Sequence, residues 1–520
     1  MLSLSNLKAK QAETYYQADD YYTNEKSNLS GFRPQWSGKG AAALNLSGEI
    51  KAADFKGLLN GYAPDGKPLF QRQVDSNKRR GGTDYTLSAP KSVSIAALVQ
   101  QDERVLAAHH YAVRVALSVI ESRYVESRIT VSPGNRQRVF TGNIISAMFT
   151  HQTSREFDPQ LHTHCVTINA TQAPDGRWFS FSNENVIRNQ KLLGEIYQNE
   201  LAHQLQQSGY QIEPTIDGQF ELKGYNEELL QSFSQRRQQI KALMEKWSTE
   251  HDPLVDGSGK PIKNTAARRE AANLRSRKNK CHDIAREDLI KAWQQHIEAE
   301  GFTLPTLPDA SNKFPAQSTA PEIIHKGIEH CEERRTVFNR EKIERFALEH
   351  HLGQQPFNQL ETALNESTEL IRVEPRQEQA SSCTTKAAVQ LELNTIRTMH
   401  QGKGQVLPLA HSRQIQTATA DKTLTAGQLS AIHLSATSKD QIIAWQGVAG
   451  AGKTYALAIT KTLAEQSGYQ AKGYAPSAEA ANVLGESLQI ETATVAHLLN
   501  TEKARLGPQL WIVDEASLLG

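Results

Sequence analysis

Two stretches rich in β-branched and other apolar residues stand close together in the first half of the chain. They are 139–150 (VFTGNIISAMFT) and 161–170 (LHTHCVTINA), joined by a polar segment that contains Pro159. Such runs on either side of a short connector predict two neighbouring antiparallel strands. Apolar positions recur at helical spacing over 102–126 and 189–208, and Gly209 predicts the end of the second helix. Mixed strands and helices are therefore predicted here.

The same kind of pattern predicts the organisation of the rest of the chain. Residues 226–300 and 321–375 have the spacing of helices, the first set being highly charged. Between them, 301–320 (GFTLPTLPDASNKFPAQSTA) is rich in Pro, Ser and Ala without periodicity, which predicts a linker. An α/β unit is expected from Leu424 onward. A chain of 520 residues is too long for one core, so several domains are expected.

Composition limits the protein class without assigning a function. The four cysteines have no CxxC spacing, which argues against a disulfide framework or a zinc ribbon. No apolar run is long enough to span a bilayer, and the first residues (MLSLSNLKAK) lack the core of a signal peptide. A cytoplasmic protein without membrane insertion is therefore expected.

Basic residues are concentrated locally, although the net charge is only +1. Lys78, Arg79 and Arg80 stand beside two glycines, and a longer basic run covers 260–280. Clusters of this kind are either solvated surface or contacts to DNA phosphates. We treat both clusters, together with Arg155, as candidate DNA contacts.

Three histidines around the predicted strand pair are candidate metal ligands. His162 and His164 project from the same face of a strand, and His151 comes alongside if the strands pair. Three imidazoles with open positions are typical of a catalytic metal site. Imidazoles suit Mn, Zn, Ni, Co or Fe better than Mg, which prefers oxygen ligands. Taken alone, the H-x-H pair also fits separate surface histidines on a hairpin.

Two tyrosine pairs, Tyr15-Tyr16 and Tyr21-Tyr22, are candidate nucleophiles. A phenol can attack phosphorus and keep the phosphoryl group as a covalent ester, and two pairs would permit two successive attacks. Because a phenol titrates near pH 10, attack near neutral pH needs help from a metal or a base, for which Asp84 is a candidate. Aromatic packing for the tyrosines and a turn carboxylate for Asp84 remain the alternatives.

The segment GVAGAGKT (447–454) matches the phosphate-binding loop GxxxxGK[ST]. In such a loop backbone N–H groups wrap the phosphates, the lysine reaches the β- and γ-phosphates, and the threonine holds Mg²⁺. The run 441–446 is predicted to be the buried strand that precedes the loop, and 455–463 the helix that follows. The candidate ATP-binding residues here are Gly447, Gly450, Gly452, Lys453 and Thr454.

Further motifs around this loop are typical of a helicase motor. LWIVDEASLLG (510–520) is predicted as a strand that ends in Asp514, to bind Mg²⁺, and Glu515, to orient the attacking water. LTAGQ (424–428) resembles the adenine-reading motif of superfamily 1 helicases, which suggests Gln428. Residues 473–484 and 493–499 resemble the DNA-contacting motifs of these helicases, with ordinary α/β packing as the alternative. Since a second RecA-like lobe is not in the sequence, we expect these 520 residues to nick DNA but not to unwind it.

Four ordered features of the first half together resemble the MobF-type conjugative relaxases, plasmid-transfer proteins with a relaxase and a helicase on one chain. They are the doubled tyrosines, WSGKGAAALNLSG (36–48), DYTLSAPKSVS (84–94) and HQTSREFDPQLHTH (151–164). The match runs through most of residues 1–240. The resemblance implies an α+β relaxase domain with a palm-like central antiparallel sheet covered by helices. A helical subdomain and a partial α/β P-loop (RecA-like) domain would follow.

The resemblance also implies roles for individual residues. Tyr15 is implied as the nucleophile at the nick and Tyr21 as the one used in a second transfer. His151, His162 and His164 are implied to hold a divalent metal (Mn, Zn, Ni, Co or Mg). Asp84 is implied either to orient a histidine or to accept the tyrosine proton.

The function expected from these features is initiation of conjugative DNA transfer. The enzyme would nick a plasmid transfer origin through a 5′-phosphotyrosine, and a truncated 5′–3′ ATP-dependent helicase would follow. DNA, accessory relaxosome proteins and a coupling protein are the expected partners. A rolling-circle replication initiator and a non-catalytic DNA-binding module are the alternatives. The expected domains are relaxase 1–300, linker 301–320, helical helicase subdomain 321–420 and incomplete first RecA-like lobe 421–520.

Overall fold

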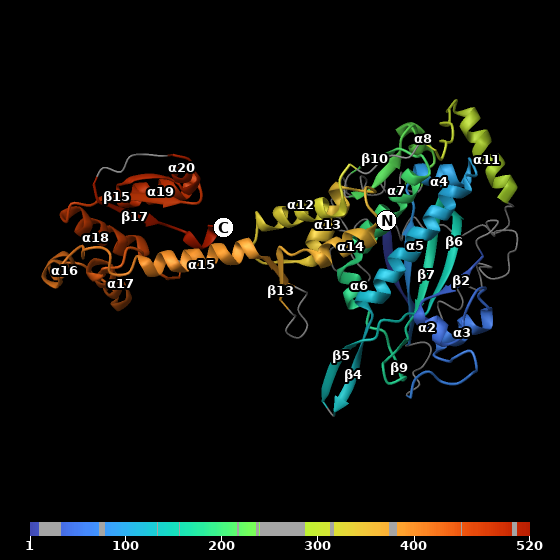
Figure 1. Cartoon of the computed structure of the whole chain (residues 1–520), viewed down its shortest axis with the longest axis horizontal. Coiled ribbons are helices and arrows are strands. Elements are labelled where there is room, and N and C mark those ends of the chain that lie inside the picture. Colours follow the sequence, from blue (N-terminus) through green and yellow to red (C-terminus); the bar gives the residue numbers. More distant parts are fainter. Residues whose placement is uncertain are drawn as a thin grey trace, which may run out of the picture. The chain divides into compact units, whose positions relative to one another are not determined.

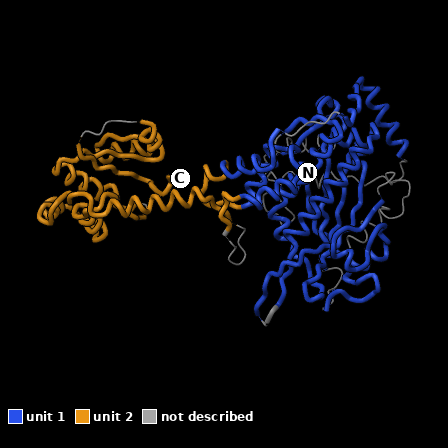
Figure 2. Tube along the Cα trace, viewed as in Figure 1, with its two compact units in different colours: residues 1–329, 340–367 blue, residues 330–339, 368–520 orange. Residues whose placement is uncertain are grey.

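The chain forms two compact units (Figure 2). Unit 1 comprises residues 1–329 and 340–367, and unit 2 comprises 330–339 and 368–520. In the part of the chain that is described, no helix combines the length and apolar character needed to cross a bilayer. The computed structural model describes residues 1–9, 33–71, 79–132, 134–154, 156–215, 218–235, 239, 286–311, 317–373, 382–448, 450–501 and 507–519.

Unit 1 is built on a five-stranded antiparallel sheet with the order β1-β3-β7-β6-β2. The two predicted neighbouring strands are β6 and β7, which pair antiparallel as expected. The first of the two stretches is divided, because β5 ends at Phe140 and β6 begins only at Ser146. The strands of the sheet are β1 (Leu2–Lys8), β2 (Gln35–Ser37), β3 (Arg80–Ser88), β6 (Ser146–Thr153) and β7 (Pro159–Ile168).

The two faces of this sheet are covered by different elements. One face packs Phe149, Val166 and Ile168 against α2 (Lys39–Ala43) and α3 (Ala52–Asn60) in one apolar cluster. The other face lies under α4 (Lys91–Leu98), α5 (Glu103–Tyr124) and α7 (Gln190–Gln207) (Figure 1). The central strands are therefore buried on both faces, apart from the end that carries the histidines.

Local signals mark the ends of the two long helices. The side chain of Asp102 accepts a hydrogen bond from the backbone N–H of Arg104 and caps α5, with Glu103 in its first turn and Arg123 in its last. Helix α7 ends before Gly209, whose φ of 88° is the left-handed conformation that glycine adopts without strain. Both predicted helices are thus confirmed within a residue or two.

Smaller elements surround this core. Strands β4 and β5 form a hairpin that extends away from the sheet (Figure 1). The remaining elements of unit 1 are β4 (Glu126–Ser132), β5 (Asn135–Phe140), β8 (Thr171–Gln172), β9 (Trp178–Phe179), α6 (Glu184–Arg188), β10 (Ile212–Pro214), β11 (Phe220–Leu222), α8 (Glu227–Ser232), α11 (Arg286–Ala299), α13 (Arg340–His350) and α14 (Phe357–Glu366), with most of α12 (Ala320–Glu332).

Helices α13 and α14 are fixed to α5 and α7 by buried polar contacts. Arg123 of α5 donates to Glu344 at 2.9 Å and to Glu361 at 2.6 Å. Asn199 of α7 accepts from the backbone N–H of Gly353 at 2.8 Å. The segment 340–367 is therefore part of unit 1, whereas the sequence grouped it with 321–420; the domain roles expected for these ranges stay predictions.

Unit 2 contains a three-stranded antiparallel sheet, β12-β14-β13, and a three-stranded parallel sheet, β16-β15-β17. Helices accompany each parallel strand, as expected for an α/β unit. The elements are β12 (Phe338–Asn339), β13 (Leu370–Val373), β14 (Ser382–Thr385), α15 (Lys386–Gln401), α16 (Ser412–Thr419), α17 (Ala426–Thr437), α18 (Lys453–Gln466), β15 (Gln470–Ala475), α19 (Ala478–Leu488), β16 (Glu491–Thr494), α20 (Val495–Asn500), β17 (Gln509–Val513) and a 3₁₀ turn (Ala516–Leu518).

The prediction of a buried strand at 441–446 is wrong. Residues 442–448 carry no strand, and the side chain of Ile442 is 48% exposed. An apolar run becomes a buried strand only where neighbouring strands supply hydrogen bonds, and no described strand pairs with this one. Trp445 instead donates its indole N–H to Ser435 Oγ of α17 at 2.8 Å.

Candidate active site

The three predicted metal ligands come together on one face of the sheet. His151 of β6 and His162 of β7 are direct cross-strand partners, and His164 follows on the same face of β7. Their ring centroids are separated by 5.1 Å (His162–His164), 5.2 Å (His151–His164) and 5.3 Å (His151–His162). The hairpin alternative, with separate histidines, is therefore not what the structure shows.

The spacing of the rings fits a shared metal ion. With metal–nitrogen distances of about 2.1 Å and angles of about 105°, the ring centroids would lie roughly 5.1 Å apart. In their present orientations, no group of three or more His, Cys, Asp or Glu side chains among the described residues could hold a metal ion. The positions of the three ring centroids therefore fit one shared ion.

Asp84 lies beside this cluster on the adjacent strand β3. Its Oδ2 is 2.7 Å from Nδ1 of His164, and Thr86 Oγ1 is 3.1 Å from the same nitrogen. Nδ1 of His162 lies 3.0 Å from the backbone oxygen of Gln160. A histidine whose Nδ1 donates to an oxygen presents Nε2 to a metal in a fixed orientation. The placement of Asp84 fits the first of its two expected roles, that of orienting a histidine.

The turn that joins the two histidine-bearing strands is tightly held. Phe157 has a left-handed backbone (φ 62°), and the side chain of Ser154 accepts from the backbone N–H groups of Glu156 and Asp158. Trp293 of α11 donates its indole N–H to the carbonyl of Phe157 at 2.8 Å. Trp293 therefore contacts this turn from outside the strand pair.

Two buried ionisable groups lie at the start of β7. Lys91 donates to the carbonyl of Pro159 at 2.9 Å, and burial lowers the pKa of Lys91 to about 8. Burial raises the pKa of Asp158 above its usual range, although the charge of Lys91 opposes this shift. These groups support the strand that carries the histidines and do not belong to the cluster.

Several predicted site residues fall outside the described residues. They are the four tyrosines (Tyr15, Tyr16, Tyr21 and Tyr22), Lys78, Arg155 and the basic run 260–280.

Arg79 and Arg80 do not form the exposed basic patch that was predicted. Arg79 is buried, with its guanidinium 4.3 Å from the ring centroid of Phe70. Arg80 donates to Asn183 at 2.8 Å, to Asn169 at 2.6 Å and to the carbonyl of Phe181. Both guanidinium groups therefore have contacts within unit 1, and the prediction that they contact DNA stays a prediction.

The segment predicted to bind phosphates, 447–454, is described except for residue 449. Gly450 and Gly452 have left-handed φ values of 77° and 71°. Lys453 at the start of α18 donates to the carbonyls of Gly447 (2.9 Å) and Val448 (3.3 Å). Gln428 donates to the carbonyl of Ala451 at 3.0 Å, and a Cβ on Gly452 would collide with its amide. Gln428 thus contacts the loop itself.

Asp514 and Glu515 follow β17, as predicted. The backbone N–H of Asp514 donates to the carbonyl of Tyr474 at the end of β15. Glu515 is left-handed (φ 52°), and its N–H donates to Asp514 Oδ1 at 2.9 Å.

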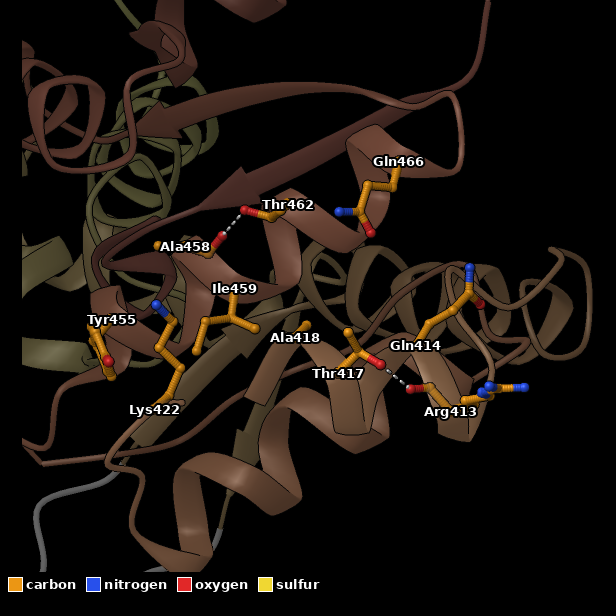
Figure 3. A pocket seen from close by; sticks show the side chains of 10 residues that line it. All are labelled: Arg413, Gln414, Thr417, Ala418, Lys422, Tyr455, Ala458, Ile459, Thr462 and Gln466. Carbon is orange, nitrogen blue, oxygen red and sulfur yellow. Dashed lines mark hydrogen bonds between the residues drawn. The ribbon is translucent and has the colours of Figure 1, made fainter. Parts of the chain in front are cut away.

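A separate cavity of about 710 Å³ lies between α16 and α18 (Figure 3). Arg413 and Thr417 line it from α16, and Tyr455 and Thr462 from α18. Tyr455 directly follows Thr454, but none of the predicted ATP-binding residues lines the cavity. It lies along the helix beyond the phosphate-binding loop.

Three residues that contact the histidine-bearing strands or their turn were not predicted: Thr86, Trp293 and His109. His109 lies on the buried face of α5 and reaches Thr163 of β7 at 2.8 Å. Helical spacing indicates that His109 faces the core, but nothing in the sequence indicates which strand it meets.

Comparison with known families separates the chain into two matched regions. The family model described as TrwC relaxase matches residues 9–300. The model described as AAA domain matches residues 423–520.

Curated relatives and solved structures agree with these matches. The Multifunctional conjugation protein TraI of Escherichia coli is 34% identical over 362 residues, covering 65% of this chain and 19% of that protein. TraI of Escherichia coli strain K12 is 32% identical over 362 residues, with the same coverage. The chain thus spans about a fifth of the length of the curated relatives it matches.

Two solved structures resemble the chain over the whole of their own length. The metal-bound structure of the conjugative relaxase TrwC in complex with oriT DNA is 34% identical, with a TM-score of 0.51. The copper-bound complex is 35% identical, with a TM-score of 0.50. Each match covers 58% of this chain and 99% of the other.

Proposed function

We propose, because the chain belongs to the TrwC relaxase family, that it nicks one DNA strand at a plasmid transfer origin and rejoins it. The observation that carries the proposal is the group of three imidazoles across β6 and β7, with the carboxylate of Asp84 behind His164. The relatives support it, since TraI is a conjugation protein and TrwC was solved with oriT DNA. These relatives favour conjugation over rolling-circle replication.

His151, His162 and His164 would hold one divalent metal ion. Bound there, the ion would act as a Lewis acid that withdraws charge from the scissile phosphate. The metal-bound and copper-bound TrwC structures support a metal role, and the choice among Mn, Zn, Ni, Co and Mg belongs to the proposal. Asp84 would hold the ring of His164 in position through Nδ1.

Tyr15 would supply the nucleophile. Its phenol oxygen attacks phosphorus after losing its proton, the bond from phosphorus to the 3′ oxygen breaks, and that oxygen takes up a proton. The strand then has a free 3′-hydroxyl, and the 5′-phosphate is esterified to tyrosine. Tyr21 would perform the second transfer, with Tyr16 and Tyr22 as the second members of the two pairs. Attack by the 3′-hydroxyl reverses the reaction and rejoins the strand.

Residues 423–520 would bind ATP and Mg²⁺ as part of a 5′–3′ helicase motor. The AAA domain match supports nucleotide binding in this region. Gly447, Gly450, Gly452 and Lys453 would contact the phosphates, Thr454 and Asp514 would hold Mg²⁺, Glu515 would orient water and Gln428 would read adenine. Accessory relaxosome proteins and a coupling protein are the proposed protein partners.

The test is covalent capture of DNA by the full chain. The protein is incubated with a labelled single-stranded library of random sequence and Mn²⁺, and adducts are separated on a denaturing gel. We expect a labelled protein band whose tyrosine–DNA peptide is identified by mass spectrometry as Tyr15.

Variants separate the alternatives. Tyr15→Phe and His162→Ala should abolish the adduct, while Tyr111→Phe, on the exposed side of α5, should keep it. Tight binding of intact DNA without any adduct would contradict the proposal and indicate a binding module.

A further inference from the structure

A chain of hydrogen-bonding side chains lies behind the histidine cluster, on the opposite face of the sheet. Tyr197 of α7 lies 2.8 Å from Nδ1 of His109, and Nε2 of His109 lies 2.8 Å from Thr163 Oγ1. Thr163 Oγ1 lies 2.9 Å from Thr150 Oγ1 on the neighbouring strand. Two helices and two strands are therefore linked through four side chains, which we call the α5 relay.

The α5 relay is neutral and fully satisfied. His109 and Tyr197 are completely buried, and burial holds the pKa of His109 well below its ordinary value and the pKa of Tyr197 well above. A neutral imidazole has one donor and one acceptor nitrogen, so every group in the relay can donate to the next in one direction. Buried polar groups joined in this way specify one arrangement, because any displacement leaves a group without its partner.

The threonines of the relay are direct sequence neighbours of all three histidines. Thr150 precedes His151, and Thr163 stands between His162 and His164. Thr150 and Thr163 are also cross-strand partners. A slip of one residue between the strands would turn the histidines of one strand to the face under α4, α5 and α7. The contact between the two threonine hydroxyls therefore lies at the point in the β6–β7 pairing where the register brings the three imidazoles together.

Thr163 lies in apolar surroundings, where packing alone does not require a hydroxyl group. Its neighbours on the same face, Leu161 and Cys165, are fully buried, and its partner on β3 is the buried Leu87. A valine would match threonine in shape there. The structure nevertheless places a hydroxyl on each histidine-bearing strand and a histidine above them.

We propose that His109 is a positioning residue that acts through Thr163 to hold His151, His162 and His164 in the arrangement that binds the metal. This inference rests on the proposed metal site but concerns residues that do not touch the metal. It assigns a role in the relaxase unit to α5 and α7, the helices that hold the sheet from behind.

The test compares two threonines of β7 that are buried on the same face of the strand. Thr167 is buried on the same face as Thr163 and donates to Ser146 of β6 at 3.2 Å, but it does not meet His109 or flank a histidine. Thr163→Val and Thr167→Val each remove one buried hydroxyl. Co²⁺ is titrated into the full chain, and both its affinity and its visible spectrum are recorded, with thermal unfolding as the check on folding.

Two substitutions of His109 test the direction of the effect. The amide of glutamine reaches the position of Nε2 and keeps the link to Thr163, while the shorter asparagine keeps only the link to Tyr197. We expect Thr163→Val and His109→Asn to weaken Co²⁺ affinity by about tenfold and to change the spectrum, as outer-shell substitutions do. Thr167→Val and His109→Gln should keep a Co²⁺ affinity and a visible spectrum close to those of the original protein.

The outcomes separate this inference from the proposed function. Equal Co²⁺ affinity and spectra for Thr163→Val and Thr167→Val would overturn the positioning role while leaving the metal site intact. If His162→Ala leaves Co²⁺ binding unchanged, the proposed metal site itself fails, and this inference fails with it.

Discussion

Asp84 Oδ2 lies 2.7 Å from Nδ1 of His164, across the pairing of β3 with β7. The side chains are 9% and 15% exposed, so water screens the interaction weakly. A carboxylate in this position fixes the tautomer of the ring and makes Nε2 a better metal ligand. The relationship joins a strand near the start of the unit to the histidine pair more than seventy residues later in the chain.

Removal of this carboxylate should weaken metal binding without unfolding the protein. We expect Asp84→Ala to lower Co²⁺ affinity by about 10–100-fold, because the ring of His164 loses its orienting partner. The Co²⁺ affinity of Asp84→Asn should lie between those of Asp84→Ala and the original protein, because its amide oxygen can still accept from Nδ1. Isothermal titration of the full chain measures this, with the exposed Asp175→Ala as control. An Asp84→Ala protein with unchanged affinity would show that Asp84 does not orient His164.

The Trp293 indole should stabilise the turn between the histidine-bearing strands. Trp293→Phe keeps the buried ring but leaves the carbonyl of Phe157 without its donor, which should cost about 1–3 kcal/mol in the free energy of unfolding. Trp511→Phe, which loses only an exposed bond to Gln509, is the matched control. Urea unfolding monitored by circular dichroism compares them, and equal losses for both variants would assign Trp293 a packing role alone.

The alternation of residues along β7 made the histidine cluster predictable. Side chains two apart share a face, and the connector between the strands is too short for any pairing other than antiparallel. The contributions of Asp84, Thr86 and His109 could not be predicted in the same way. They depend on which distant strand pairs with β7 and which helix crosses behind it, and neither is set by local pattern.

Two differences between the sequence pattern and the structure have a common physical origin. Arg79 and Arg80 look like a surface cluster, but a Cβ at Gly82 would meet the carbonyl of Thr167, so close strand packing draws this segment inward. The apolar run 441–446 looks like a strand, yet it has no described pairing neighbour. In both cases the close packing and the pairing of neighbouring strands decide the structure, and local composition does not.

Arg123 should be critical for attaching α13 and α14 to the sheet-bearing core. Glu344 is 2% exposed, and loss of Arg123 leaves it paired only with Arg340 at 2.8 Å. Breaking a buried ion pair from one side costs about 3–5 kcal/mol, so Arg123→Met should approach that loss. The double variant Arg123→Met/Glu344→Leu should recover part of it. Urea unfolding measures the differences; a double variant less stable than Arg123→Met would contradict this explanation.

Glu195 should make the stability of unit 1 depend on pH. Burial, with help from the neighbouring Glu349, raises the pKa of Glu195 from 4.5 to about 8, while Arg345 opposes the shift. Between these two values the folded protein binds more protons than the unfolded chain, so this group's contribution falls as pH rises. Glu195→Gln, which mimics the protonated acid, should gain stability relative to the original protein as pH rises from about 5 to 8. Unfolding midpoints across this range test it, and a constant difference would contradict the prediction.

Gly452 should be required for nucleotide binding because of two separate constraints. Its φ of 71° is strained for any other residue, and a Cβ would push the amide of Gln428 away from the carbonyl of Ala451 to which it donates. Gly468, at the other end of α18, has a similar φ of 83° but open space around it. We therefore expect Gly452→Ala to reduce binding of a fluorescent ATP analogue by about 5- to 30-fold, because the loop relieves about 1–2 kcal/mol of left-handed strain by leaving this conformation. Gly468→Ala should bind the analogue normally, since its strain lies away from the phosphates. If both variants bind equally, the contact between Gln428 and the loop has no part in shaping the site.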